Sequence, residues 1–245
     1  MEKRLKKIYS FLKANRKYNM TVQIGDYGSS LLPYNDVYNK VYALLYNIHN
    51  SQSKISMDKA AGFYQSISSK KRNLSSFTNF LTVLGGTKRL PITYKYLYEL
   101  LKKQSSWGNK TAALFAKAIY NTHAGYATQF KFWEDAPTVL IENDELYLPV
   151  DAVIYFIFEQ LGKPCNHTFK GINNYIKNCL PESDFEVWDD LWFWGFITQK
   201  GGGKIRTMEF NEAKYWNLLH TPKDQMVIAE IKILSKEFIR LLKNG

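Results

Sequence analysis

The chain has 245 residues, which is enough for one large domain or for two closely packed lobes. Its content of 45% hydrophobic and 16% aromatic residues excludes an intrinsically disordered protein. The formal net charge of +11 and the isoelectric point near 9.4 favour a polyanionic partner, because clustered cations release counterions from phosphates.

Membrane, secretory and metal-binding classes find no support in the sequence. The segment MEKRLKKIYSFLKANRK is charged throughout and does not resemble a signal peptide, and the longest apolar runs, VIYFIF and LWFWGFI, are too short to cross a bilayer. Cys165, Cys179 and the four scattered histidines lack metal-ligand spacing. We therefore expect a cytoplasmic protein with no membrane partner, no metal and no cofactor.

Apolar residues at helical spacing predict a series of helices. Four of them lie within 34–50 and 74–86, then over 93–103 and 109–121. Gly85 and Gly86 would end the second of them. The fold class predicted by this series is mostly α.

The last predicted helix has the most complete set of end signals. Thr221 is suited to cap it, Pro222 to its first turn and Asp224 to the positive end of its dipole. We therefore expect this helix to begin at Thr221.

Two segments break the helical pattern. TVLIENDELYLP, residues 138–149, predicts a small β-hairpin around an Asn143-Asp144 turn. TVQIGD, which carries Gln23, also has a strand-like pattern. The expected β content is small.

The stretch SSWGNKTAALFAKAIY, residues 105–120, joins two predicted helices by the tight connection QSSWG. Such a turn directs unpaired backbone N–H groups at a helix N-terminus toward an anion, as a DNA phosphate would require. A nucleotide-binding phosphate loop is excluded, because Asn109 separates Gly108 from Lys110 and the pattern GxxxxGK[ST] is not met. A solvated lysine at the start of an exposed helix is the alternative interpretation.

The motifs WGNKTAALFAKAI and LPVDAVI together resemble the signature of the helix-hairpin-helix DNA glycosylases. The Lys-Thr-Ala and Pro-Val-Asp elements match, whereas Trp107-Gly108 departs from the usual Gly-x-Gly hairpin. The resemblance implies a two-lobed helical fold, forming one catalytic domain over 1–245 with the helix-hairpin-helix at about 93–121. It also implies DNA contacts from the hairpin residues Trp107, Gly108, Asn109 and Thr111.

The resemblance further implies the chemistry of two residues. Lys110, at a helix N-terminus and partly desolvated between two lobes, should lose its proton more readily than an ordinary lysine and attack the sugar anomeric carbon. Asp151 would stabilise the positive charge that builds on the sugar and help to move protons. A Schiff base and β-elimination would follow, as in the bifunctional members of the family.

Lys110 and Asp151 are 41 positions apart (151 − 110), which is a long connection for the family. A long connection resembles the archaeal-type 8-oxoguanine glycosylases, a branch without an iron-sulfur cluster, and this chain has no four-cysteine set.

Three further residues are candidates for holding the damaged base. Asp190 and Trp194 are four residues apart and would share a helix face, so that one accepts a hydrogen bond from a purine and the other stacks on it. Core packing is the alternative for this pair, and for Trp192 and Phe193 it is the preferred interpretation. Gln23 is an amide that would suit a base edge.

The sequence thus predicts a DNA repair glycosylase and abasic-site lyase that flips and excises an oxidised purine, 8-oxoguanine first among them. Its partner would be double-stranded DNA with a damaged base, and we expect a monomer associated with the nucleoid. Two alternatives stay open: a monofunctional glycosylase for other damaged bases, and a non-catalytic helix-hairpin-helix module that binds DNA.

Overall fold

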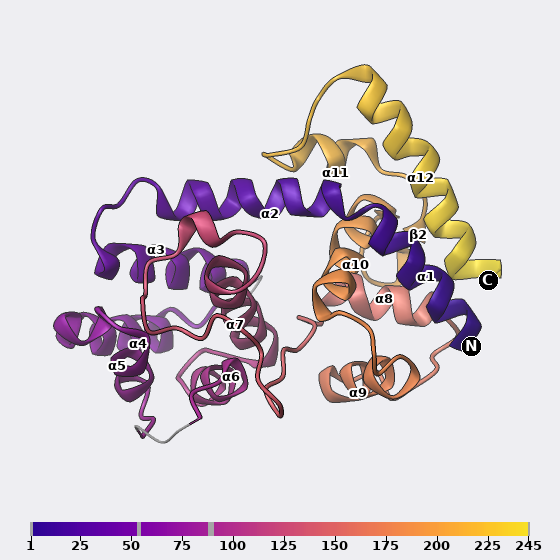
Figure 1. Ribbon diagram of the computed structural model, residues 1–245. Coiled ribbons are helices and arrows are strands. Elements are labelled where there is room, and N and C mark those ends of the chain that lie inside the picture. The colour runs from indigo at the N-terminus through magenta and orange to yellow at the C-terminus, as the bar shows by residue number, and fades with distance from the viewer. Residues whose placement is uncertain (1, 53–54, 88–90, 245) are drawn as a thin grey trace. The chain divides into compact units, whose positions relative to one another are not determined.

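The computed structural model describes residues 2–52, 55–87 and 91–244, without the side chains of residues 204 and 244. In these ranges the chain forms twelve α-helices, three short 3-10 helices and two strands (Figure 1). It divides into two compact units, Met1–Gly25 with Val150–Gly245 (unit 1) and Asp26–Pro149 (unit 2). The chain passes between the units within α2 and again after Pro149.

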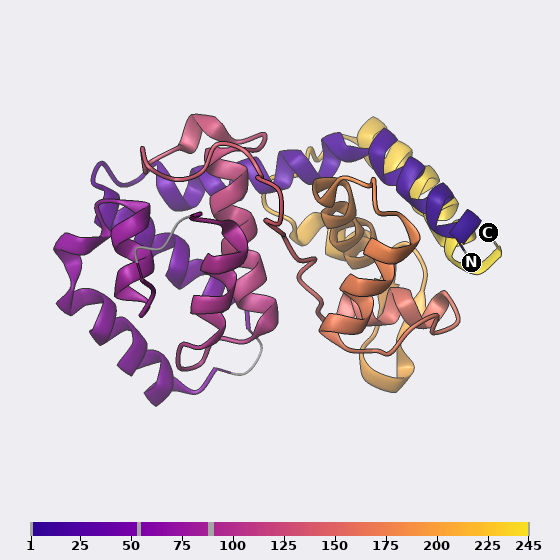
Figure 2. The same ribbon diagram turned by 60° about the horizontal axis from the view of Figure 1, so that its bottom comes forward.

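Unit 1 is built around α10, which is buried along most of its length. It packs against α1, α8, α11 and α12, and α1 and α12 lie side by side (Figure 1 and Figure 2). The elements of unit 1 are α1 (Glu2–Ala14), the first part of α2 (Arg16–Leu31), α8 (Ala152–Gln160), α9 (Phe169–Cys179), α10 (Phe185–Ile197), β1 (Gln199–Lys200), η3 (Gly203–Ile205), β2 (Thr207–Met208), α11 (Glu212–Asn217) and α12 (Gln225–Asn244).

Unit 2 is built around α7, whose small and apolar side chains are enclosed by α3 and α6. Trp133 is completely buried in this unit and donates its indole N–H to the carbonyl of Leu74 at 2.8 Å. Its elements are α3 (Val37–Asn50), α4 (Met57–Ser69), η1 (Lys71–Leu74), α5 (Phe77–Val83), α6 (Tyr94–Lys102), α7 (Asn109–His123) and η2 (Thr128–Phe130).

The helices predicted within 34–50, 74–86, 93–103 and 109–121 are confirmed as α3, α5, α6 and α7. Three of them begin with a side-chain cap: Asp36, Ser76 and Thr93 each accept the N–H of the residue three positions on. Local signals were sufficient here because the capping residue directly precedes an apolar, helical repeat.

The β-hairpin predicted at 138–149 is wrong. Asn143 does form a turn, with φ of +71°, but no strand is present in this segment. The carboxylate of Asp144 accepts the N–H groups of Tyr94 and Lys95 and so holds the segment at the start of α6. The two strands that do form, β1 and β2, pair antiparallel around the glycine-rich turn at 201–203.

Two other local predictions are also wrong. TVQIGD is not strand-like, since it lies within α2. The last helix begins at Gln225, not at Thr221, because Asp224 accepts the N–H of Val227 and serves as its cap. Thr221 is buried and donates its hydroxyl to the carbonyl of Leu218.

Candidate functional site

The connection between α6 and α7 is a tight hairpin at residues 103–108. Ser106 has φ of +66°, a left-handed conformation that a side chain seldom adopts without support. Support comes from α3, because the Nε2 atom of His49 lies 2.9 Å from the Ser106 hydroxyl, and Gln52 donates to the Ser106 carbonyl at 3.4 Å. The hairpin is therefore fixed by the C-terminal end of a neighbouring helix of the same unit.

Trp107 lies beneath this hairpin and not on its surface. It is 5% exposed and stacks on the ring of His49 at a centroid distance of 5.2 Å, with Phe63 and Phe115 against its other sides. The indole therefore anchors the hairpin in the core of unit 2, and the expected DNA contact of Trp107 stays a prediction that its burial does not favour.

The first turn of α7 divides the other expected DNA contacts into two groups. Thr111 is 1% exposed, and its hydroxyl accepts the N–H of Gly108 at 3.1 Å, so it caps the helix and has no surface to offer. Gly108 and Asn109 are exposed at the hairpin tip, and the amide oxygen of Asn109 accepts the hydroxyl of Tyr98 at 2.9 Å. The tip available to an anion therefore consists of Gly108 and Asn109.

Lys110 is the second residue of α7 and is partly exposed. Its amine donates to the backbone carbonyl of Ser51 at 3.4 Å, which is a long hydrogen bond to a neutral acceptor. Among the described residues it forms no ion pair with a carboxylate. The amine is therefore positioned by the end of α3 without being neutralised.

Asp151 is the N-cap of α8 in unit 1. One carboxylate oxygen accepts the N–H groups of Val153 at 2.8 Å and Ile154 at 3.1 Å. The other oxygen accepts the indole N–H of Trp192 at 3.2 Å. With three donors on two oxygens, the carboxylate is fixed in orientation while the residue stays partly exposed.

The surroundings of Asp151 contain two cations that the sequence did not reveal. Arg206 follows η3 and binds the Ala152 carbonyl and, at 3.1 Å, the amide oxygen of Gln199. Lys214, on α11, has its amine 4.9 Å from the ring centroid of Phe196. Burial lowers the pKa of Lys214, the charge of Arg206 lowers it further, and the charge of Asp151 partly opposes both.

Asp190 and Trp194 do share a helix face, but that face is the core of unit 1. Trp194 is completely buried among rings that include Phe11 and Phe238, and Asp190 is 1% exposed. The Asp190 carboxylate accepts the amide of Asn19 at 2.7 Å and lies 3.5 Å from the guanidinium of Arg16. Neither side chain has an exposed surface, so the structure favours the core-packing interpretation of this pair over the base-holding one, which stays a prediction.

The expected site residues thus belong to both units. Lys110 and the hairpin belong to unit 2, and Gln23 and Asp151 belong to unit 1. Gln23 is a partly exposed residue of α2, and so remains a candidate reader of a base edge. Trp192, which we assigned to the core, is instead the partner of Asp151.

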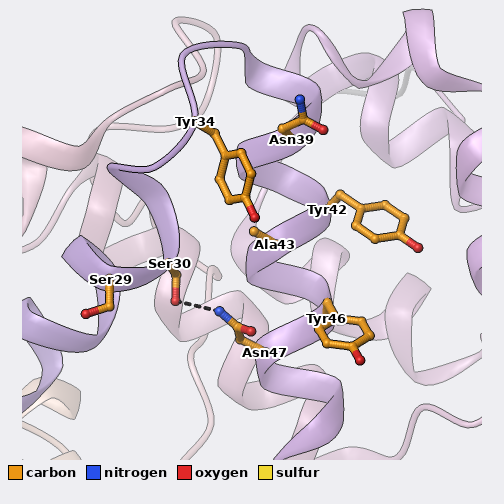
Figure 3. A pocket seen from close by; sticks show the side chains of 8 residues that line it. All are labelled: Ser29, Ser30, Tyr34, Asn39, Tyr42, Ala43, Tyr46 and Asn47. Atoms are coloured by element: carbon orange, nitrogen blue, oxygen red, sulfur yellow. Dashed lines mark hydrogen bonds between the residues drawn. The ribbon is translucent and has the colours of Figure 1, made fainter. Parts of the chain in front are cut away.

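A cavity of about 230 Å³ lies in unit 2, between the end of α2 and the outer face of α3. Figure 3 shows its polar lining, in which Asn47 donates to the hydroxyl of Ser30 at 2.9 Å. None of the residues predicted for the site lines it. Its side chains are Ser29, Ser30, Tyr34, Asn39, Tyr42, Ala43, Tyr46 and Asn47.

In the described ranges no helix has the length and apolar content needed to cross a membrane. No three histidine, cysteine or carboxylate side chains gather as a metal site in those same ranges. Comparison with protein-family models, with curated proteins and with solved structures finds no match for the chain.

Proposed function

We propose that the protein is a DNA glycosylase and abasic-site lyase that excises an oxidised purine, 8-oxoguanine first among the candidates. The observation that carries the proposal is the setting of its two motif residues. Lys110 has an accessible amine beside the exposed hairpin tip, and Asp151 has a carboxylate held at the start of α8. These are the two groups that nucleophilic displacement of a base requires.

The hairpin supports DNA as the partner. The first N–H groups of a helix lack intrahelical acceptors. In α7 these groups follow directly after the exposed residues Gly108 and Asn109, which form the hairpin tip. A DNA phosphate can accept from such groups without any sequence preference. The net charge of +11 adds an attraction to any polyanion.

The chemistry follows from the two side chains. The unprotonated amine of Lys110 attacks the anomeric carbon of the flipped nucleotide, the carbon–nitrogen bond to the base breaks, and the base leaves with a proton. The Asp151 carboxylate stabilises the positive charge on the sugar during this step. The sugar ring then opens to a Schiff base, from which β-elimination breaks the strand on its 3′ side.

One observation favours a second candidate, a helix-hairpin-helix module that binds DNA without catalysis. Burial of Asp190 and Trp194 removes the pair expected to hold the base. The hairpin and the positive charge would still bind a DNA backbone in such a module.

Borohydride trapping on labelled duplexes that carry 8-oxoguanine, uracil or thymine glycol tests the proposal. We expect a covalent adduct on the 8-oxoguanine duplex with the wild type, and none with Lys110→Gln, which keeps its DNA affinity. Lys103→Gln is the matched control, because Lys103 is an exposed cation at the other end of the same hairpin.

Three results would contradict the proposal in different ways. An alkali-labile abasic product without an adduct would indicate a monofunctional glycosylase. Binding that does not depend on the lesion, with no excision, would indicate the binding module. An adduct of undiminished yield with Lys110→Gln on the 8-oxoguanine duplex would show that another amine displaces the base.

A further inference from the structure

The amine of Lys214 has a setting unlike that of the other lysine in unit 1 whose pKa is lowered by burial. Lys223 donates to the carbonyls of Tyr215 and Leu218 at 2.8 and 2.7 Å, and so its amine is fully engaged. Lys214 has no hydrogen-bond acceptor among the described residues, and its amine rests on the Phe196 ring. An amine in that position is available to a reactant.

The backbone around Lys214 holds it in place. Asn211 caps α11 by accepting the N–H of Lys214 at 3.3 Å, and the N–H of Asn211 in turn donates to the carbonyl of Ile197 at 2.7 Å. These bonds tie α11 to the C-terminal end of α10. The rings of Phe196 and Trp192 stack at 5.0 Å on that helix, and Trp192 donates to Asp151. A continuous set of contacts therefore connects the lysine to the carboxylate.

Two features of this cluster lower the pKa of the Lys214 amine. Arg206 is a second cation close enough to act on Lys214, and partial burial against Phe196 removes water from the charged form. Lysines activated for Schiff-base chemistry are desolvated or placed beside another cation, and both conditions hold here.

We propose that Lys214 is a second imine-forming amine, which condenses with the aldehyde of an abasic deoxyribose beside the Asp151 carboxylate. The inference rests on the proposed function for the identity of this aldehyde. It assigns Lys214 no part in base removal, which stays with Lys110.

The step balances without a cofactor. The amine nitrogen attacks the aldehyde carbon of the ring-opened sugar and a carbon–nitrogen bond forms. The carbonyl oxygen takes one proton from that nitrogen and one from solvent and leaves as water. The resulting iminium ion carries a positive charge, which the neighbouring carboxylate of Asp151 stabilises.

The first test uses a duplex with a preformed abasic site, so that no glycosylase step is needed. With borohydride, which reduces the imine to a stable secondary amine, we expect an adduct with Lys110→Gln that maps to Lys214 by peptide mass spectrometry. The double variant, Lys110→Gln with Lys214→Gln, should form no such adduct. Lys110→Gln combined with Lys200→Gln is the matched control, since Lys200 is a cation of β1 in the same unit and is 65% exposed.

A second test removes DNA altogether. Glycolaldehyde with cyanoborohydride at neutral pH labels free amines, and we expect Lys214 to be labelled faster than Lys200, since burial against Phe196 lowers the pKa of Lys214 and leaves more of its amine unprotonated. Circular dichroism of Lys214→Gln establishes that the variant is folded.

The proposal requires both results. Labelling of Lys214 no faster than Lys200, or the absence of an abasic-site adduct at Lys214, overturns it. Failure of the proposed function is a separate outcome, because a protein that leaves 8-oxoguanine in place would still give both signals at Lys214.

Discussion

The starts of α7 and α8 show two ways of presenting a polar side chain at a helix N-terminus. At α7 a buried hydroxyl, that of Thr111, provides the cap, and Lys110 is left with one long bond to a backbone carbonyl. At α8 the candidate residue itself is the cap, and Asp151 accepts three hydrogen bonds. One arrangement leaves an amine partly exposed with a single weak partner, and the other fixes a carboxylate.

This difference matches the tasks of the two groups in the proposed chemistry. A nucleophile has to move along the path of bond formation, whereas an electrostatic partner acts best when it is oriented before the reaction begins. Substituting a fixed polar group and substituting a weakly held one should therefore change base excision and stability by different amounts.

The largest effect is expected from Asp151→Asn. Asparagine still caps α8 through its amide oxygen, but it lacks the negative charge and cannot accept from Trp192 with its NH₂ group. We expect base excision to fall by about a hundredfold to ten-thousandfold, with little change in stability. Single-turnover excision on the 8-oxoguanine duplex measures it.

Asp144→Asn is the matched control for that variant. Asp144 accepts the backbone N–H groups of Tyr94 and Lys95 in the first turn of α6 in unit 2, as Asp151 accepts two backbone N–H groups at the start of α8. Excision that falls equally in both variants would show that loss of a carboxylate at either helix start has the same effect, and would remove the proposed role of Asp151.

Asp190→Ala should have the next largest effect, and on stability alone. The change leaves Asn19 and Arg16 facing a cavity in the core of unit 1, which costs about 3 kcal/mol when one member of a buried pair is removed. Urea unfolding followed by circular dichroism measures it.

Glu230→Ala supplies the comparison for Asp190. Glu230 pairs with Lys17 at 3.4 Å on the exposed surface of the same unit, so its removal should have little effect on unfolding. An unfolding midpoint equal in the two variants would show that the buried network contributes no more than an exposed pair. Loss of base recognition in a stable Asp190→Ala protein would restore the role that the sequence predicted.

The helices were predictable where a cap directly precedes an apolar repeat, as at Asp36 and Thr93. The structure of residues 138–149 could not be predicted in this way. Its alternating pattern fits a β-strand, but it also fits an extended segment that packs without a strand partner. Leu146 and Leu148 are buried there, while the Asp144 carboxylate binds α6, and no local signal reports a contact about 50 residues away.

The motif residues of the candidate site could be located from sequence, but their neighbours could not. In α10 two aromatic faces compete, Trp192 with Phe196 and Trp194 with Phe193, and periodicity alone does not say which one faces the core. Folding of α11 and of the β1–β2 hairpin brings Arg206 to the Ala152 carbonyl and Lys214 within the electrostatic influence of Asp151, which a linear spacing does not encode.

His123 makes the stability of unit 2 depend on pH. Burial lowers the pKa of His123 to about 4, and the neutral ring accepts the N–H of Trp133 at 3.1 Å. Because the folded state resists protonation, stability is complete above a pH of about 6.5, the pKa of an unfolded histidine, and falls from there toward pH 4. The expected loss by pH 4 is about 3 kcal/mol.

The measurement is urea unfolding of the wild type and of His123→Gln at intervals from pH 7 to pH 4. The glutamine variant is less stable at pH 7, since it packs less well against Phe132 and Trp133, but its stability should fall less over this range. If the stabilities of the two proteins fall in parallel with pH, His123 is excluded as the source of the pH dependence.

The smallest effect is expected from Thr111→Val, which tests the cap that supports the Lys110 position. Valine fills the same buried space but cannot accept the N–H of Gly108, so we expect unfolding to become easier by about 1 kcal/mol. Thr82→Val on α5 is the control, because the exposed hydroxyl of Thr82 bonds only within its own helix.

If the cap also sets the start of α7, adduct formation on the 8-oxoguanine duplex falls in Thr111→Val and not in Thr82→Val. A stability loss with unchanged adduct yield would show that Lys110 reaches its target without a fixed first turn.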